Sequence, residues 1–205
     1  MKTIEEILED VVEDKKDNLS TTSFKFKKDL WDFFKNIPNS NKFNCVEFGT
    51  HKGQTTRVLS YLFDQGRIYT INLPGHMDQA RLLNSDRKNI SFVEMNLYPR
   101  NGIVVEPGFD HKNINVCFVD ASHTTESVLM DFSRIKLFQK YDPCYVVFDD
   151  YGLENSVFVA VEQLIKFGQL EKIAYIGHEP RHSFGGFPER VLKNYEGIIC
   201  KIKQI

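Results

Sequence analysis

The fold is decided by the stretch Glu47-Phe48-Gly49-Thr50-His51-Lys52-Gly53-Gln54-Thr55-Thr56, residues 47–56. It joins an apolar run ending near Phe48 to an amphipathic run beginning near Thr55, so we expect a tight turn from a strand into a helix. Gly49 and Gly53 allow a sharp turn and a close approach to a ligand, because neither carries a Cβ. The N–H groups that open the helix, with Thr55, predict a place for a carboxylate. A plain glycine-bearing turn is the structural alternative.

Short apolar runs alternate with amphipathic stretches after this turn. The strands expected first are 43–48, 68–73, 90–95, 116–119 and 145–148. The helices expected between them are 55–63, 77–83, 124–138 and 157–167. Two later runs, 173–176 and 197–202, predict a terminal hairpin-like pair. Regular strand and helix alternation predicts an α/β fold, with a mostly parallel seven-stranded sheet and helices on both faces.

The N-terminal residues show helical periodicity instead. Apolar side chains recur at helical spacing within residues 3–17, and we expect this helix to pack at the edge of the domain. A second helical pattern follows the Ser/Thr cluster at 20–23 and is closed by Pro38. We therefore expect a single domain over 1–205, with a helical extension at 1–40 and an α/β core at 41–205.

Composition excludes several classes of protein. Lys and Arg total 26 against 28 acidic residues, so no basic excess indicates nucleic-acid binding. The four cysteines, Cys45, Cys117, Cys144 and Cys200, have no metal-ligand spacing and are each expected inside an apolar run that forms a strand, which is typical of buried thiols in a reducing compartment. No apolar stretch is long enough to span a membrane, and no signal-peptide core is present. A cytoplasmic location is expected.

Polar residues stand where the predicted strands end. In order along the chain they are Glu47 with Gly49, Asn72, Asn96, Asp120, and Asp149 with Asp150. In parallel sheets, ligands bind beyond the carboxyl ends of the strands. One edge of the sheet therefore carries the candidate site.

Two of these strand ends suggest chemistry. Asp120 is followed three residues later by His123, which predicts a carboxylate and an imidazole in one cleft. Asp149 and Asp150 follow a buried strand, and with Asp120 they offer three hard oxygen ligands suited to Mg²⁺. The alternatives are a surface or capping histidine and a solvated acidic turn.

Residues 43–151 resemble the metal-dependent class I O-methyltransferases, of the catechol O-methyltransferase type and, more closely, the macrocin and mycinamicin sugar O-methyltransferase group. The shared motif is E-x-G-x-x-x-G-x-[ST], matched by Glu47, Gly49, Gly53 and Thr55. The resemblance implies the Rossmann-like class I methyltransferase fold and S-adenosyl-L-methionine as cofactor. It also implies that Asp120, Asp149 and Asp150 are metal ligands and that His123 is the catalytic base.

The cofactor is expected across the ends of the first four strands. The residues expected to bind it are Glu47, Gly49, Thr50, His51, Gly53, Thr55, Asn72, Asn96 and Asp120. Asn72 departs from the resemblance, because the family usually has an acidic residue there to bind both ribose hydroxyls. An amide lacks the charge-assisted strength of a carboxylate, which predicts weaker cofactor binding.

The reaction expected is methyl transfer to a hydroxyl oxygen of a small molecule, with a divalent metal, Mg²⁺ above all, lowering the pKa of that hydroxyl. Segments 96–112 and 179–188 are expected to set specificity, although the second is equally consistent with an ordinary connector. A metal-free methyltransferase acting on another acceptor and a non-catalytic adenosyl-ligand-binding module remain as alternatives. No nucleic-acid or membrane partner is expected, and a homo-oligomer is possible.

Overall fold

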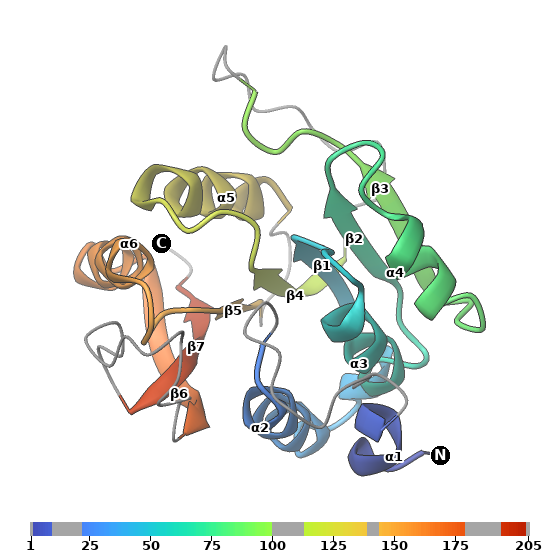
Figure 1. The fold of residues 1–205 in the computed structure, drawn as a ribbon. Helices are drawn as coiled ribbons and strands as arrows, with labels where there is room; N and C mark the ends of the chain where they lie inside the picture. Colours follow the sequence, from blue (N-terminus) through green and yellow to red (C-terminus); the bar gives the residue numbers. More distant parts are fainter. Residues whose placement is uncertain (1, 10–21, 100–112, 139–143, 179–193, 204–205) are drawn as a thin grey trace.

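The computed structural model describes residues 2–9, 22–99, 113–138, 144–178 and 194–203. Within these residues, seven strands form one sheet in the order β3-β2-β1-β4-β5-β7-β6 (Figure 1). The strands are β1 (Asn44–Phe48), β2 (Ile68–Asn72), β3 (Ile90–Glu94), β4 (Ile114–Val119), β5 (Tyr145–Phe148), β6 (Leu170–His178) and β7 (Tyr195–Ile202). The helices are α1 (Ile4–Glu9), α2 (Phe24–Lys35), α3 (Gln54–Leu62), α4 (Asp78–Leu83), α5 (Thr125–Phe138) and α6 (Asn155–Lys166), with a short 3₁₀ helix η1 (Ser40–Lys42).

The predicted fold class is confirmed. Strands β1 to β5 pair in parallel, and β7 pairs antiparallel with both β5 and β6. The helices cover both faces of the sheet (Figure 1). The arrangement is the Rossmann-like class I methyltransferase fold. The single-domain boundaries stay a prediction.

The register of the parallel strands aligns their carboxyl ends. Phe48 pairs with Ile71 of β2 and with Val119 of β4, and Val119 pairs with Phe148 of β5. The residues that follow these strands therefore leave the sheet at the same edge, as in other parallel sheets whose ligands lie there.

Each face of the sheet has its own apolar cluster. Alternate residues of the central strands, such as Val46 and Cys117, pack with α5 and α6. The intervening residues, such as Cys45 and Phe118, pack with α1, α2 and α3. All four cysteines are free and buried, as the sequence predicts, although Cys144 lies one residue before β5.

The N-terminal helix α1 packs its apolar side on α2 and α3, and its acidic side is exposed. Ile7 and Leu8 of α1 are fully buried in the cluster that includes α2, α3 and the sheet. The amphipathic pattern identified the helix correctly, but it could not say which surface covers the apolar side. Residues 10–17 of the predicted helix lie outside the described residues.

Strand β6 is longer than the four residues predicted. It lies at the end of the strand order, and Glu171 and Lys172 near its start are exposed. An edge strand with one polar side does not read as an apolar run, so only its middle was predicted.

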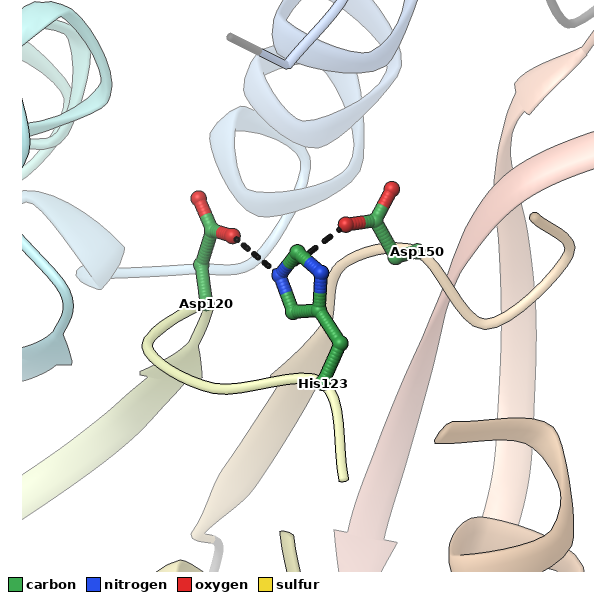
Figure 2. A group of neighbouring side chains, drawn as sticks. All are labelled: Asp120, His123 and Asp150. Atoms are coloured by element: carbon green, nitrogen blue, oxygen red, sulfur yellow. Dashed lines mark ion pairs between the residues drawn. The ribbon is translucent and has the colours of Figure 1, made fainter. Parts of the chain in front are cut away.

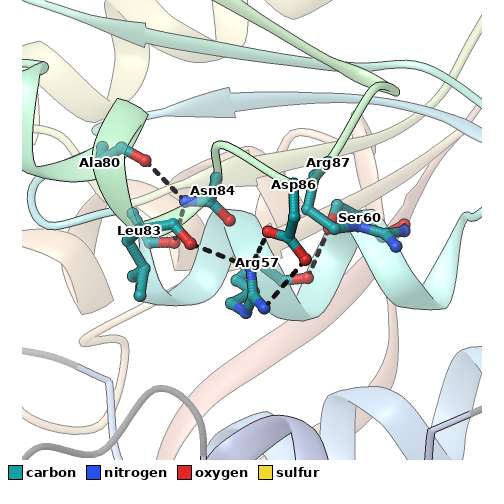
Figure 3. Close-up of polar contacts among 8 residues, drawn as sticks. Arg57, Ser60, Ala80, Leu83, Asn84, Asp86 and Arg87 are labelled. Atoms are coloured by element: carbon teal, nitrogen blue, oxygen red, sulfur yellow. Dashed lines mark hydrogen bonds and ion pairs between the residues drawn. The ribbon is translucent and has the colours of Figure 1, made fainter.

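Polar contacts fix α4 against α3 (Figure 3). The Arg57 guanidinium of α3 donates to the Leu83 carbonyl at 2.9 Å and to the Asp86 carboxylate at 2.7 and 3.2 Å. The Asn84 amide donates to the carbonyls of Gly53 at 3.0 Å and Ala80 at 2.9 Å. The chain between β2 and α4 is thereby held beside the turn that follows β1.

Candidate active site

The turn after β1 is built from unusual backbone angles. Gly49, His51 and Gly53 have φ values of +98°, +44° and +77°, in the left-handed region that glycine adopts without strain. A Cβ on Gly49 would lie 2.1 Å from the Asp120 carbonyl oxygen, so this glycine allows β1 and β4 to approach. A Cβ on Gly53 would lie 2.7 Å from the Ala80 Cβ. Both glycines are required by the packing of the chain itself, a reason that the motif alone did not reveal.

Glu47 lies beneath this turn. Its side chain is fully buried, and its Oε2 accepts hydrogen bonds from the hydroxyls of Thr56 and Thr70, each at 2.5 Å. Thr70 is the cross-strand neighbour of Glu47 in β2, and its hydroxyl also lies 2.6 Å from that of Thr50. Burial raises the pKa of Glu47 to about 8, against the lowering effect of the two threonine hydrogen bonds. Glu47 is therefore mostly a neutral acid at pH 7.

A cavity of about 550 Å³ opens beside the turn. It contains six of the nine residues predicted to bind the cofactor: Gly49, Thr50, His51, Thr55, Asn72 and Asp120. Glu47, Gly53 and Asn96 are not among its lining residues. Asn96 is exposed and accepts a hydrogen bond from the Tyr98 N–H at 2.9 Å.

The cavity also has lining residues that the sequence pattern did not predict. The cavity wall also includes Thr22, Lys52, Gln54, Leu73, Gly75, His76, Asp78, Gln79 and Ala121. Thr22 precedes α2, and its hydroxyl lies 2.8 Å from that of Thr55. It belongs to the Ser/Thr cluster that was interpreted only as a helix start, and nothing in the sequence links it to residues 33 positions away.

Three side chains meet at the ends of β4 and β5 (Figure 2). The His123 Nε2 lies 3.6 Å from Asp120 Oδ1 and 3.1 Å from Asp150 Oδ2. Asp120 and His123 both line the cavity. Asp150 has a φ of +54°, a conformation uncommon for aspartate that the surrounding structure must stabilise. The predicted pairing of Asp120 with His123 is thus present, and Asp150 joins it.

The carboxylates raise the affinity of His123 for a proton. The Asp120 carboxylate, then the charge of Asp150, raises the pKa of His123 to about 9 despite partial burial. The pKa of Asp150 is raised to about 7, first by burial and then by the charge of Asp120, while His123 opposes the rise. At neutral pH the imidazole is therefore a cation between the two carboxyl groups.

Asp149 differs from its neighbour. It is 5% exposed, and its Oδ1 is buried with no hydrogen-bond partner among the residues that the structure describes. Burial, then the charges of Asp120, Asp150 and Glu196, raise its pKa well above the usual range. The ligand atoms of Asp120, His123 and Asp150 lie within 4.8 Å of one another. Asp149 does not belong to this group.

Two predicted specificity segments cannot be compared with the cavity. Residues 179–188 lie outside the described residues, as do residues 100–112 of the segment 96–112.

Among the described helices, none is both long enough and apolar enough to cross a membrane.

Solved structures similar to this one include methyltransferases. A protein assigned as a caffeoyl-CoA O-methyltransferase from Staphylococcus aureus matches with a TM-score of 0.66 and 16% identity, over 100% of this chain and 93% of its own. The Bacillus cereus O-methyltransferase in complex with SAH matches with a TM-score of 0.62 and 16% identity, over 99% and 92%. Aeropyrum pernix fibrillarin with natively bound S-adenosyl-L-methionine matches with a TM-score of 0.56 and 16% identity, over 85% and 74%. At these identities the likeness shows the fold.

The sequence itself matches a family. No curated protein matches the chain. The family described as "Methyltransferase domain" matches residues 46–151, which is more than half of the chain and contains the turn after β1, Asp120, His123 and Asp150. The chain therefore belongs to the methyltransferase domain family.

Proposed function

We propose that this methyltransferase transfers a methyl group from S-adenosylmethionine to a hydroxyl oxygen of a small molecule, with a divalent cation held beside Asp120 and Asp150. One observation carries the proposal: Asp120, His123 and Asp150 meet beside the cavity that the Gly49–Thr55 turn lines. The cavity volume, about 550 Å³, falls within the range of roughly 300–1,000 Å³ found for small-molecule sites.

The side chains present fit a divalent cation. Asp120 and Asp150 offer carboxylate oxygens, which Mg²⁺ and Mn²⁺ prefer, and the buried Oδ1 of Asp149 is a further oxygen without a hydrogen-bond partner in the described residues. A bound divalent cation supplies positive charge that lowers the pKa of a neighbouring hydroxyl. Asp120 and Asp150 are the residues proposed to hold it, and the buried Asp149 is the residue before Asp150 in the chain.

The cavity walls fit the cofactor. S-adenosylmethionine supplies the methyl group on a sulfonium sulfur. The turn from Gly49 to Thr55 is proposed to hold its amino-acid end, with the carboxylate at the N-terminal end of α3. The exposed apolar side chain of Leu73, which also lines the cavity, offers a surface for the nucleoside.

His123 is proposed to take the proton of the acceptor hydroxyl. It must be neutral to do so, and the carboxyl groups of Asp120 and Asp150 raise its pKa to about 9. A divalent cation held by the same carboxylates would lower this pKa and leave the imidazole neutral near pH 7, the form that a general base needs. The alternative role for His123 is that of a nitrogen ligand, which would favour Mn²⁺ or another transition metal over Mg²⁺.

The test is transfer of a labelled methyl group from S-adenosylmethionine to a panel of phenols and sugars, with Mg²⁺, with Mn²⁺ and after dialysis against EDTA. We expect activity that needs the cation and is lost in Asp120→Asn and Asp150→Asn. Asp64→Asn is the matched control, because Asp64 is exposed and lies outside the cavity. Activity that survives EDTA would establish the metal-free alternative. Cofactor binding without transfer to any acceptor would support a non-catalytic module.

The acceptor is proposed to be small rather than a nucleic acid. The formal net charge of −2 argues against a surface that binds a phosphate backbone. A cytoplasmic location, one domain over 1–205 and self-association as a homo-oligomer belong to the same proposal. Size-exclusion chromatography with light scattering tests the last of these.

A further inference from the structure

The loop that carries His123 is not held by backbone hydrogen bonds. It runs from residue 120 to residue 124, between β4 and α5. Among the described residues, none of the N–H groups of residues 121–124 donates to a backbone carbonyl. The His123 side chain is 43% exposed, so packing around the ring holds it only in part. Side-chain contacts to the loop must therefore set its position beside Asp150 (Figure 2).

Ser156 makes such a contact. Its hydroxyl donates a hydrogen bond to the backbone carbonyl of His123. In return, the hydroxyl of Thr125 donates to the backbone carbonyl of Ser156 at 3.0 Å. The two bonds run in opposite directions between the same two segments, so each side chain fixes the backbone of the other segment.

The start of α6 has a fixed place relative to Asp150. The Asp150 carbonyl accepts hydrogen bonds from the N–H groups of Leu153 at 3.0 Å and Glu154 at 2.8 Å, which closes the turn between β5 and α6. Helix α6 then packs on the sheet through its buried apolar residues. Ser156 is the second residue of this helix, so its hydroxyl links the backbone of His123 to the segment that carries Asp150.

We infer that Ser156 is a positioning residue, which holds the backbone of His123 so that the imidazole stays beside Asp150 and the cavity. The inference rests on the proposed function, because it takes His123 as the general base. Such a base must lie within hydrogen-bond reach of the proton that it removes, and a displacement of about 1 Å can lower the rate about 100-fold. Ser156 is not among the residues that line the cavity, so it acts through His123 and not on a ligand.

The first test is kinetic and uses the phenol or sugar that the wild-type protein methylates fastest. Ser156→Ala should lower kcat by roughly 10- to 100-fold, the usual cost of losing a contact that orients a functional group. KM for S-adenosylmethionine should stay nearly unchanged, because no cavity residue is altered. Ser156→Thr keeps a hydroxyl and should retain most of the wild-type kcat. Thr125→Val removes the reciprocal bond and should lower kcat in the same direction.

A double variant shows whether Ser156 acts through His123. Adding Ser156→Ala to His123→Ala should cause no further loss of kcat, because the imidazole that Ser156 positions is already gone. If the two losses multiply, Ser156 acts independently of His123 and the inference is overturned.

Proton NMR of the protein without ligand gives a readout that needs no acceptor. The Cε1–H resonance of His123 is identified by its absence from the spectrum of His123→Ala. At one fixed pH, Ser156→Ala should shift this resonance, and Ser156→Thr should leave it in place.

Ser133→Ala is the matched control for both measurements. The Ser133 hydroxyl also donates to a backbone carbonyl, that of Leu129 at 2.9 Å, but it lies on the exposed side of α5 and outside the cavity. This variant should leave kcat and the His123 resonance unchanged. Urea denaturation of Ser156→Ala checks that the fold is retained.

The outcomes separate the inference from the proposed function. A wild-type kcat and an unmoved His123 resonance in Ser156→Ala overturn the inference while the proposed function stands. A loss of kcat that Ser156→Thr does not rescue also overturns it. Transfer to no acceptor at all overturns the proposed function, and the NMR comparison then still decides whether Ser156 positions His123.

Discussion

Replacing Glu47 by glutamine isolates the effect of one buried ionisable group on stability. The glutamine keeps the shape of the side chain, and its carbonyl can accept the hydrogen bonds of Thr56 and Thr70. It cannot ionise. Any difference in the pH dependence of stability between the two proteins therefore reports the ionisation of Glu47.

The magnitude follows from the pKa. Burial raises the pKa of Glu47 from 4.5 to about 8, so the folded protein binds more protons than the unfolded chain between these values. Stability therefore falls as pH rises, by about 1.4 kcal/mol for each pH unit of the difference and by about 5 kcal/mol in all. At pH 7 about 90% of the folded molecules carry a neutral Glu47, and between pH 7 and pH 9 the remaining loss is about 1.4 kcal/mol.

Urea denaturation at pH 7 and pH 9 measures this loss. The free energy of unfolding of Glu47→Gln, relative to the wild type, should increase by about 1.4 kcal/mol between the two pH values. Glu171→Gln, at an exposed position of β6, should show no such change. A difference between Glu47→Gln and the wild type that is the same at both pH values would refute the assignment of Glu47 as a neutral buried acid.

Further predictions concern the site. His123→Ala should lower kcat by roughly 10²- to 10⁴-fold while calorimetric affinity for S-adenosylhomocysteine stays unchanged, and equal loss of both would make His123 a binding residue. Affinity for Mn²⁺ should rise by roughly tenfold per pH unit from pH 7 towards 9, because protonated His123 competes with the cation for Asp120 and Asp150. His123→Ala should lose this pH dependence, and a wild-type affinity that does not change with pH would contradict the prediction. Gly49→Ala should destabilise the fold by more than about 3 kcal/mol in urea, since the new Cβ meets the Asp120 carbonyl; wild-type stability would contradict the stated packing. Asn72→Asp should leave affinity for S-adenosylhomocysteine equal or weaker, and tighter binding would show that Asn72 itself faces the ribose.

The position of the polar residues at one edge of the sheet could be predicted from the sequence, because the ends of the strands follow from local pattern. Apolar runs end at Phe48, Val119 and Phe148, and the polar residues that follow leave the sheet at one edge whatever the details of packing. The same holds for the helices that carry an apolar stripe.

The direction of individual side chains could not be predicted in the same way. Glu47 and Gly53 belong to the cofactor motif, yet one lies beneath the turn and the other packs on α4. Thr22 and Asp78 line the cavity because distant segments meet there, and no spacing in the sequence records that meeting. Asp150, whose backbone has a positive φ, lies 3.1 Å from His123, and no sequence pattern distinguishes it from Asp149.

The antiparallel strand between β5 and β6 has a consequence for biosynthesis. Among the described residues, all that line the cavity or belong to the three-residue cluster precede Tyr151, so the ribosome delivers them before β7 emerges. Yet β5, which Asp150 follows, has an open edge until residues 195–202 of β7 pair with it. Strand β6 likewise has no partner strand until β7 forms. Such unpaired edges are where nascent chains aggregate. Until β7 is made, an open strand edge therefore adjoins the end of β5 that Asp150 follows.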